Sequence, residues 1–518
     1  MWAIDRRTGW FVVFSACIGA CAFFAILWIT AGGIGVSPDS TIYIDTARNL
    51  LAGNGFVARG APMTHFPPLY PILLAVSGSF GSDILESARY LNALLFAANV
   101  ILCSVAVWLA TERSLCAAAL TGLWVMVSYG IVQPHAMVWS EPPFMVFVLI
   151  ALVALTVFIG KQRGHWLYLA SVAIGLAMLT RYVGAAFVPV LFVVPLLLAS
   201  GRFFYRVRSG AIAAFIACVP LCVWLLYNIS RAGTATNRVL AFHPPGVPFA
   251  RSVIAHTSYL LFPVWEIPLL AKAFLFTVAL SGAVSIVLWL RKRGGPSVGP
   301  REPDTALLLA AVLFLAAYFA FLVVSISLFD DGTWREGSRF FPPGLLFLLL
   351  ASITLVWSTR AKTKRTLVWW LFVLFAGVSI SVNARRDLIF GADAHRNGLG
   401  FNSIAWRNSE TLAAIRALPT GIRVFSNGAV AVQFLTGRAT YEIPARTSYG
   451  GLVRRTDFER RLRAMCDEVQ NNRAVVVYFT AYKTDWMPTP AELGSICEVS
   501  ILGTLPDGVI YGKSTSAE

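Results

Sequence analysis

Residues 37–56 of this 518-residue chain read SPDSTIYIDTARNLLAGNGF, shortly after an apolar run from Trp10 to Thr30. A run of that length can cross a bilayer as a helix, so we expect Asp39 at the mouth of the first membrane span. Apolar and aromatic residues then recur at helical spacing, at Tyr43, Ala47, Leu50 and Leu51. This pattern predicts an amphipathic helix along the membrane surface that holds Asp39 at the membrane edge.

The composition is that of a membrane protein. Hydrophobic residues make up 57% of the chain and charged residues only 13%, and the mean hydropathy is +0.69. These values lie far from the composition of an ordinary soluble domain, so they predict a polytopic α-helical membrane protein. The first apolar run is too long for the core of a signal peptide and lacks a small-residue cleavage site, so we expect it to remain as a span.

Long apolar runs predict about eleven membrane-crossing helices in the region 1–385. Their centres are expected near residues 20, 100, 123, 149, 174, 191, 218, 280, 317, 349 and 376. The first external loop, residues 32–88, is large and polar. It also carries turn signals at Asn54-Gly55 and Pro67-Pro68, which predict that the loop folds back on itself.

The distribution of Lys and Arg predicts the orientation. If the N-terminus is cytoplasmic, every short basic cluster falls on the cytoplasmic side, as the positive-inside bias requires. The clusters begin with Arg6 and Arg7, Arg113, Lys161 and Arg163, continue with Arg202, Arg206 and Arg208, and end with 291–293 and 360–365. The net charge of +16 therefore reflects topology, and scattered basic residues argue against a nucleic-acid partner.

An odd number of spans places residues 386–518 on the extracytoplasmic side, and there the pattern becomes that of a small α/β domain. The expected helices are Trp406–Leu418 and Asp457–Gln470, and the expected strands are Ile422–Ser426, Ala474–Phe479 and Val509–Tyr511. Cys466 and Cys497 lie in this exported part. The sequence is equally consistent with a disulfide between them and with two free thiols. No Gly-rich phosphate loop and no zinc-site spacing occurs in the sequence.

Ionisable residues gather at the external ends of the predicted spans. Asp39 follows the first span, Glu141 begins the fourth in the motif WSEPPF, and Arg181 ends the fifth in LTRY. Before the tenth span, the stretch WREGSRFFPP carries Trp334, Arg335, Glu336 and Arg339. Glu141 could simply stabilise a helix N-terminus, whereas an external Arg at a span end calls for an anionic partner. We therefore expect four loops to converge on a site with two carboxylates and two or three guanidinium groups.

Such a constellation suits the transfer of a sugar from a polyprenyl phosphate. The reaction needs a base for the acceptor hydroxyl and cations for the phosphate on which charge grows. Because a phosphate is a good leaving group, no strong general acid is required. Direct attack opposite the leaving group predicts inversion at the anomeric carbon.

The motifs also carry a resemblance to a known family. D-S-x-x-Y-x-x-x-A-x-N-L-L-A-G-N-G-F, HFPPLYP, WSEPPF, LTRY and SRFFPP occur in an order and spacing that resemble the GT-C superfamily of integral membrane glycosyltransferases. The bacterial branch related to protein O-mannosyltransferases and the lipid A aminoarabinose transferase is the most similar. The resemblance covers nearly the whole membrane region and, weakly, the exported domain.

The resemblance implies roles for individual residues. It implies that Asp39 is the catalytic base and that Glu141 is the second acidic residue of the site. It further implies that the donor phosphate or sugar is bound by the following residues: His65, Arg181, Arg339 and Tyr43. Protein mannosyltransferases carry an Asp-Glu pair in the first loop, whereas Ser40 follows Asp39 here. This departure argues against protein mannosylation in particular, and a divalent metal cofactor stays open.

Other functions fit parts of the sequence. A transporter or lipid flippase also needs many helices, but it predicts ionisable residues near the bilayer midplane and an internal repeat, which the sequence lacks. An assembly protein without catalytic activity would leave Asp39 and Arg339 unexplained. Within the enzyme hypothesis, a polymerase or ligase of lipid-linked glycans stays open. The loop 234–258, with Arg238 and His243, is equally well interpreted as a mobile lid or a plain surface loop. Tyr441, Arg446 and Tyr449 are candidate contacts for an acceptor, which the sequence leaves open as a glycan, a lipid or a protein.

Overall fold

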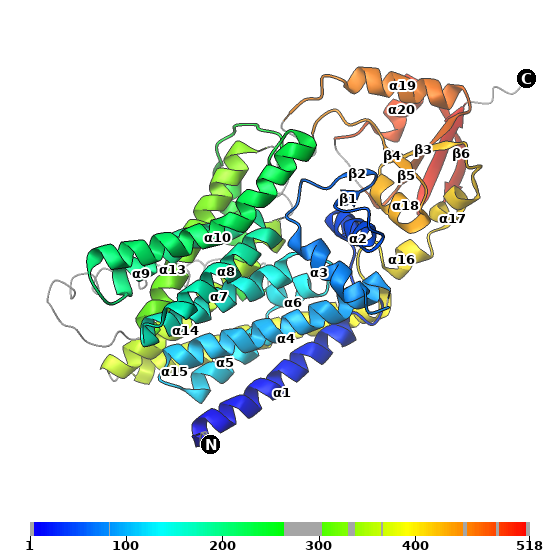
Figure 1. Cartoon of the computed structure of the whole chain (residues 1–518). Helices are drawn as coiled ribbons and strands as arrows, with labels where there is room; N and C mark the ends of the chain where they lie inside the picture. The colour runs from blue at the N-terminus through cyan, green and yellow to red at the C-terminus, as the bar shows by residue number, and fades with distance from the viewer. Residues whose placement is uncertain are drawn as a thin grey trace, which may run out of the picture.

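The computed structural model describes residues 5–81, 83–263, 303–329, 337–363, 366–448, 453–482 and 486–513. The molecule has two parts, a long helical body and a sheet domain at one end of it (Figure 1). The N-terminal end of α1 lies at the opposite end of the body from the sheet domain (Figure 1). This arrangement matches the predicted combination of a membrane region with a small α/β domain.

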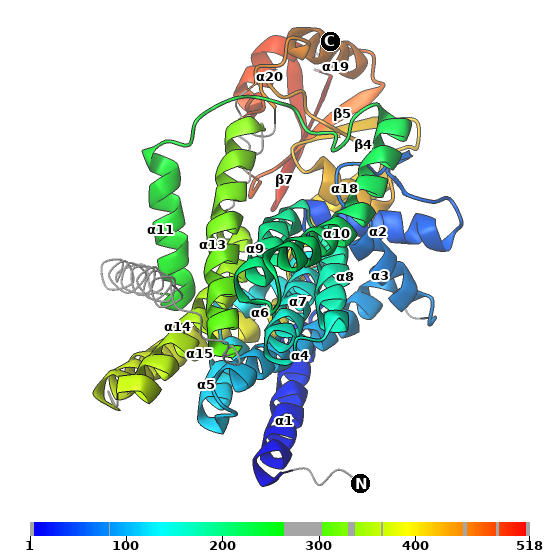
Figure 2. The same ribbon diagram turned by 60° about the vertical axis from the view of Figure 1, so that its left-hand side comes forward.

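The body is built from helices that run roughly along one direction (Figures 1 and 2). Their bounds are α1 Arg6–Ile29, α4 Ile84–Ala110, α5 Leu115–Met126, α6 Tyr129–His135, α7 Glu141–Lys161, α8 Gly164–Thr180, η1 Tyr182–Phe187, α9 Val188–Leu198, α10 Phe203–Ala232, α11 Val247–Leu261, α13 Pro303–Leu328, η3 Gly337–Phe340, α14 Pro342–Thr363 and α15 Thr366–Asn397. Helix α15 passes through the expected domain boundary at residues 385–386. The segment 234–258, for which the sequence left a mobile lid and a plain surface loop open, is a loop only before Val247, where α11 begins.

The predicted number of about eleven spans is not confirmed. Among the described residues, seven helices are long and apolar enough to cross a membrane, or eight if α5 and α6, bent by 58°, form one broken span. The spans expected near residues 174 and 191 fall on the shorter apolar helices α8 and η1–α9. The chain leaves the helical conformation at Arg181 between them, so neither reaches the length of the others. The span expected near residue 280 lies outside the described residues.

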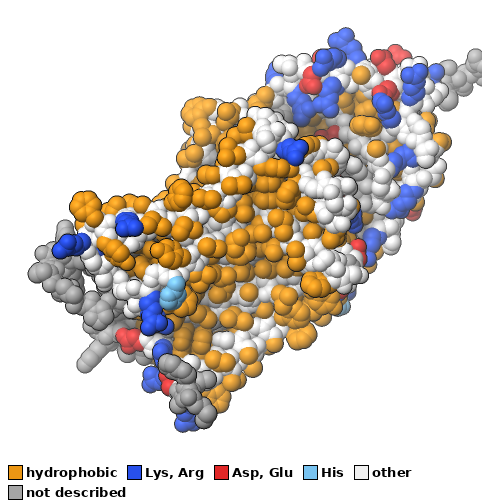
Figure 3. Space-filling model, viewed as in Figure 1, with side chains coloured by type: hydrophobic (Ala, Val, Ile, Leu, Met, Phe, Trp, Pro, Cys, Tyr) orange, Lys and Arg blue, Asp and Glu red, His pale blue; other side chains and the backbone are white. Residues whose placement is uncertain are grey.

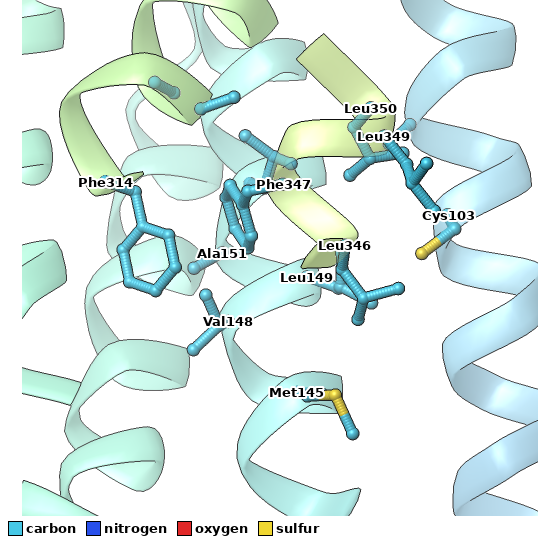
Figure 4. Packing of buried hydrophobic residues seen from close by; sticks show 14 of the residues in the cluster. Cys103, Met145, Val148, Leu149, Ala151, Phe314, Leu346, Phe347, Leu349 and Leu350 are labelled. Atoms are coloured by element: carbon cyan, nitrogen blue, oxygen red, sulfur yellow. The ribbon is translucent and has the colours of Figure 1, made fainter. Parts of the chain in front are cut away.

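Helix α7 forms the centre of the body. Most of its side chains between Glu141 and Ile159 are buried, because α4, α8, α13 and α14 surround it. Figure 4 shows Val148 and Ala151 of α7 near Phe314 of α13 and Phe347 of α14, and Leu149 of α7 beside Leu346 of α14. A helix that is apolar on every side is stable only when it is enclosed, so the uniform hydrophobicity of α7 is explained by its central position.

The outer surface of the body is apolar over a broad area. Figure 3 shows hydrophobic side chains covering the helices, while charged side chains gather on the sheet domain and at the far end. Large side chains such as Phe24 and Phe215 are 64% and 69% exposed. Contiguous apolar surface of this extent is typical of a face that contacts lipid.

The first external segment folds into two short helices and a hairpin at the sheet-domain end of the body. Helix α2 (Pro38–Leu51) is the amphipathic helix predicted from the sequence, and it is followed by β1 (Val57–Ala58), β2 (Ala61–Pro62) and α3 (Leu69–Gly78). Ser37 caps α2 by accepting a hydrogen bond from the Ser40 amide, and Ser40 Oγ accepts one from Ser37 N. This reciprocal cap fixes the first turn of α2, which carries Asp39.

The sheet domain contains a five-stranded sheet of order β4-β3-β5-β7-β6. Strands β4, β3 and β5 are parallel to one another, and β7 and β6 add antiparallel strands at one side. The strands are β3 Arg423–Ser426, β4 Thr440–Glu442, β5 Ala474–Phe479, β6 Val499–Leu505 and β7 Gly508–Lys513. The helices are α16 Ile404–Arg407, α17 Glu410–Ala417, α18 Ala429–Thr436, α19 Phe458–Gln470 and α20 Pro490–Cys497. Cys466 and Cys497 form a disulfide between α19 and the end of α20.

The single helix predicted over Trp406–Leu418 is wrong, since α16 and α17 are separate. Ser409 lies between them and its side chain accepts a hydrogen bond from Leu412 N, so it caps a new helix. The polar residues Asn408 and Ser409 favour such a start over an uninterrupted helix.

The sheet domain packs directly onto the external segment. Phe401 and Ala431 of the domain share one buried cluster with Val36, Ile44 and Tyr70 of the body. Val36 pairs with Gly400, whose φ of 57° is a left-handed conformation. A Cβ at residue 400 would collide with the carbonyl of Val36, so glycine permits this close approach of the two parts.

Candidate functional site

A cavity of about 420 Å³ opens at the sheet-domain end of the body. It lies among α2, α10, α13, η3 and the break between α8 and η1. The residues that line it and bear on function are Asp39, Tyr43, His65, Ser140, Thr180, Arg181, Tyr182, Arg238, Tyr318, Ser325, Arg339 and Phe340. Four stretches that are far apart in the sequence therefore converge, as the sequence analysis predicted.

Asp39 and Arg339 form an ion pair in the wall of the cavity. Asp39 Oδ2 lies 2.7 Å from Arg339 Nη2, and the two side chains are 26% and 15% exposed. Asp39 is held by the capped first turn of α2, and Arg339 by the short helix η3. The guanidinium of Arg339 also lies over the rings of Phe340 and Trp139, at 4.9 and 5.5 Å. These rings and the carboxylate fix the orientation of the guanidinium.

Glu141 and Arg181 form a second, more deeply buried pair. Glu141 Oε1 lies 2.7 Å from Arg181 Nη1, and the carboxylate side chain is only 2% exposed. Arg181 also donates a hydrogen bond to Ser140 Oγ at 3.1 Å and lies over Phe340 at 5.5 Å. Because Arg181 lines the cavity and Glu141 lies behind it, the carboxylate orients the cation that a ligand would meet.

Ser140 and Tyr43 connect the two pairs. The Tyr43 hydroxyl lies 3.3 Å from Ser140 Oγ, and the Tyr43 ring packs against Phe66 and Tyr70. Burial, with a smaller contribution from Asp39, raises the pKa of the Tyr43 phenol well above its usual range. The phenol therefore stays protonated and can donate a hydrogen bond into the site.

Two further cationic or polar side chains border the cavity from the external loops. His65 lies in the turn before α3 and its ring contacts Phe66 edge-on. Arg238, in the loop before α11, lies 5.9 Å from the rings of both Tyr182 and Phe329. Arg238 thus brings a third guanidinium to the cavity wall.

One side of the cavity is apolar. Leu221 and Leu225 of α10 face Phe321, Leu322 and Val324 of α13 across it. Both helices also expose apolar side chains on the outer surface of the body. The cavity thus places several cationic groups beside an apolar wall, a combination that fits a ligand with an anionic head and a hydrocarbon tail.

The structure brings together the six residues to which the sequence analysis gave a role in the site. Asp39, Tyr43, His65, Arg181 and Arg339 line one cavity, and Glu141 lies directly behind Arg181. Their assigned roles stay predictions. Four further cavity residues were given no role by the sequence analysis: Ser140, Thr180, Tyr182 and Tyr318. The first three stand inside the quoted motifs WSEPPF and LTRY, next to Glu141 and Arg181, whereas Tyr318 lies in an apolar run without a motif. Trp334, Arg335, Glu336 and Tyr449, also singled out above, lie outside the described residues.

The residues present do not form an evident metal site. No group of three or more His, Cys, Asp or Glu side chains that could hold a metal ion occurs within the described ranges. Both carboxylates of the site are instead paired with arginine. We therefore derive no step of the chemistry through a metal.

The fold is shared with known membrane proteins. The whole chain superposes on ArnT from Cupriavidus metallidurans bound to undecaprenyl phosphate with a TM-score of 0.58, at 16% sequence identity, covering 98% of this chain and 99% of ArnT. This chain has the GT-C glycosyltransferase fold. The resemblance noted from the sequence motifs is thereby confirmed.

Other proteins with the GT-C fold also match. An oligosaccharyltransferase from Archaeoglobus fulgidus superposes with a TM-score of 0.55 at 11% identity, covering 96% of this chain and 73% of that one. The arabinofuranosyltransferase AftD from Mycobacteria reaches 0.50 at 15% identity, covering 100% of this chain and 40% of AftD. By sequence, the model of the family described as dolichyl-phosphate-mannose-protein mannosyltransferase matches residues 49–203. A search of curated proteins by sequence finds no match.

Proposed function

We propose that this protein is a glycosyltransferase that moves a sugar from a polyprenyl-phosphate donor to an acceptor at the extracytoplasmic membrane surface. The observation that carries the proposal is the position of Asp39 opposite Arg339 in a cavity with an apolar wall. ArnT, which shares the fold over its whole length, has been seen with undecaprenyl phosphate bound. The same class of lipid fits the cationic head region and the apolar wall found here.

In this proposal the donor phosphate binds among the guanidinium groups that line the cavity. Arg181 is oriented by Glu141, and Arg238 approaches from the opposite loop. The polyprenyl tail lies along the apolar wall between α10 and α13, so that the head reaches the site while the tail stays in lipid. Planar guanidinium groups suit this task because each can bind two phosphate oxygens at once.

Donor binding also explains how Asp39 acts as a base although it is paired with Arg339. The donor phosphate competes for Arg339, and as the guanidinium turns toward the phosphate, Asp39 becomes available to the acceptor. The acceptor hydroxyl passes its proton to Asp39 while its oxygen bonds to the anomeric carbon. The bond from that carbon to the phosphate oxygen breaks, and the electron pair stays on the phosphate, which Arg339 stabilises. Attack from the face opposite the phosphate inverts the anomeric carbon.

The experiment is to measure release of free polyprenyl phosphate from a panel of polyprenyl-phosphate sugars by purified protein in lipid bilayers, with candidate acceptors. Wild type and Asp39→Asn run side by side. Asp45→Asn is the matched control, because Asp45 lies on the same helix but accepts a hydrogen bond from Arg59 N in the hairpin.

Release by wild type and Asp45→Asn that falls at least a hundredfold in Asp39→Asn is expected. Equal release by all three proteins would remove Asp39 from the mechanism. No release with any donor would contradict the proposed function and make transport of lipid-linked substrates the hypothesis to test next.

We also propose that the N-terminus is cytoplasmic and the sheet domain extracytoplasmic, in a bacterial inner membrane. The Cys466–Cys497 disulfide supports this orientation, because disulfides persist in oxidising compartments. A membrane-impermeant maleimide should label Arg460→Cys in cells whose outer membrane has been permeabilised, and should label Arg163→Cys only after the inner membrane is opened. The reverse labelling order would overturn the orientation.

A further inference from the structure

Helix α4 crosses the body as an apolar helix, yet it buries two asparagines on one face. Asn92 and Asn99 are seven residues apart and both are fully buried. Burying a polar side chain in the apolar core of a membrane protein costs free energy, so such side chains are found where they have a specific hydrogen-bond partner. Both amides point at the short segment that leads into α7 and carries Ser140 and Glu141.

Asn92 holds the beginning of this segment. Its Nδ2 donates hydrogen bonds to the carbonyl oxygens of His135 and Met137, at 3.1 and 2.6 Å. The segment needs such donors, because Pro134 and the two prolines at the start of α7 remove backbone N–H groups that could otherwise bond to nearby carbonyls.

Asn99 holds the end of the segment and the ring of His135. Its Nδ2 donates to the Pro142 carbonyl at 3.2 Å and lies 2.9 Å from His135 Nε2. His135 Nδ1 lies 2.6 Å from the Ile131 carbonyl, which can only accept, so Nδ1 carries the proton. Nε2 of the neutral ring is then an acceptor, and both amide hydrogens of Asn99 are used. Phe96, between the two asparagines on α4, packs on the same ring at 4.8 Å.

The other side of the segment is fixed by α2. Ser40 Oγ donates to the Val138 carbonyl at 2.8 Å, and Trp139 Nε1 donates to Ser37 Oγ at 2.9 Å. The turn from Trp139 to Glu141 is therefore clamped between α2 on one side and Asn99 on the other. Ser140 and Glu141, which orient Arg181, sit in the middle of this clamp.

We propose that Asn99 is a positioning residue, which acts through the Pro142 carbonyl and His135 to hold Glu141 against Arg181. The inference rests on the proposed function, since the consequence of a loose Glu141 is a misplaced cation at the donor phosphate. The alternative is that Asn99 only satisfies the backbone of a proline-rich turn and contributes stability alone. The two differ in whether the effect of Asn99 passes through Glu141.

The test compares Asn99→Leu with Asn92→Leu, the same substitution seven residues earlier on the same face of α4. We expect kcat for lipid-phosphate release to fall roughly tenfold or more in Asn99→Leu, with the donor KM within about twofold of wild type. In a Glu141→Gln background the same substitution should have almost no further effect, because residues that act as a unit are not additive. An equal loss of kcat in both backgrounds, or a loss no greater than that of Asn92→Leu at matched thermal stability, would overturn the proposal.

A second readout needs no donor. In a background with the six free cysteines replaced, the rate at which a small methanethiosulfonate modifies Ser140→Cys reports the position of the turn in the cavity. We expect Asn99→Leu to change this rate severalfold and Asn92→Leu to change it less. An unchanged rate would refute the inference even if no donor were turned over, whereas a changed rate with an inactive wild type would count against the proposed function alone.

Discussion

Removing Arg181 should expose how strongly the buried Glu141 depends on its partner. The Glu141 side chain is 2% exposed and its Oε1 lies 2.7 Å from Arg181 Nη1. Replacing Arg181 with methionine keeps most of the aliphatic volume and removes the charge. The carboxylate is then left in a buried place without its cation, which is the situation that makes broken buried ion pairs costly.

The magnitude follows from two figures. Two unit charges about 4 Å apart attract by about 4 kcal/mol at an effective dielectric constant of about 20, and losing one partner of a buried pair typically costs about 3–5 kcal/mol. The penalty should therefore be about 4 kcal/mol.

The assay is thermal unfolding of purified protein in one detergent and at one scan rate, since unfolding of large membrane proteins is commonly irreversible. Arg181→Met, Glu141→Gln, the double variant and wild type are compared at pH 7. Arg48→Met on α2 is the control for loss of an exposed arginine.

We expect Arg181→Met to have the lowest midpoint at pH 7 and the double variant to recover most of the difference. The double variant recovers because it also removes the carboxylate that Arg181→Met leaves without a cation. A Glu141 that is well solvated would behave differently. If Arg181→Met and the double variant unfold together, the reasoning about the buried pair is refuted.

Three further outcomes follow from the site and the sheet domain. Arg339→Gln should lower kcat by roughly 10²–10³ and Arg339→Lys by less, because lysine keeps the charge without the planar fork; equal losses in release assays would contradict a bidentate phosphate contact. Burial raises the pKa of Asp507, but hydrogen bonds from two hydroxyl side chains outweigh it and hold the pKa below its usual value. The ionised Asp507 therefore contributes its full stabilisation above the unfolded pKa of about 3.9, and this stabilisation is lost as the pH falls through the folded pKa. In Asp507→Asn, the stability of the sheet domain measured by hydrogen exchange should fall less steeply with decreasing pH than in wild type. Reduction of the disulfide between Cys466 and Cys497, which are 31 residues apart, should destabilise the domain by about 4 kcal/mol. Unchanged proteolysis of α19 after reduction would contradict this.

Local patterns were sufficient for several features. The α2 helix, the strands β3, β5 and β7, and the helix α19 were predicted within a few residues, since each rests on periodicity and turn residues within one short stretch. Motif order also predicted that Asp39, Glu141, Arg181 and Arg339 share a site, because residues at the same end of successive spans must lie at one membrane surface.

Other features depended on packing between distant segments. The predicted number of spans was not confirmed among the described residues, because a count of apolar runs does not show where a run bends at a polar residue such as Arg181 or breaks after Met126. The sequence likewise could not reveal which carboxylate pairs with which arginine, since Asp39 and Arg339 are three hundred residues apart. Their pairing depends on where α2 and η3 meet in space.

The amino-acid sequence alone determined that the chain is a membrane protein and that its ionisable residues gather on one side of the membrane. It also indicated the chemistry that these residues suit, because hydrophobicity and charge act locally along the chain. Only the tertiary structure decided that Asp39 faces Arg339, that Glu141 is buried behind Arg181, and that Asn99 and His135 hold the turn between them. Those contacts join α2, α4, α7, α8 and η3, and a hydrogen bond or ion pair forms only where folding brings its two partners within about 3 Å.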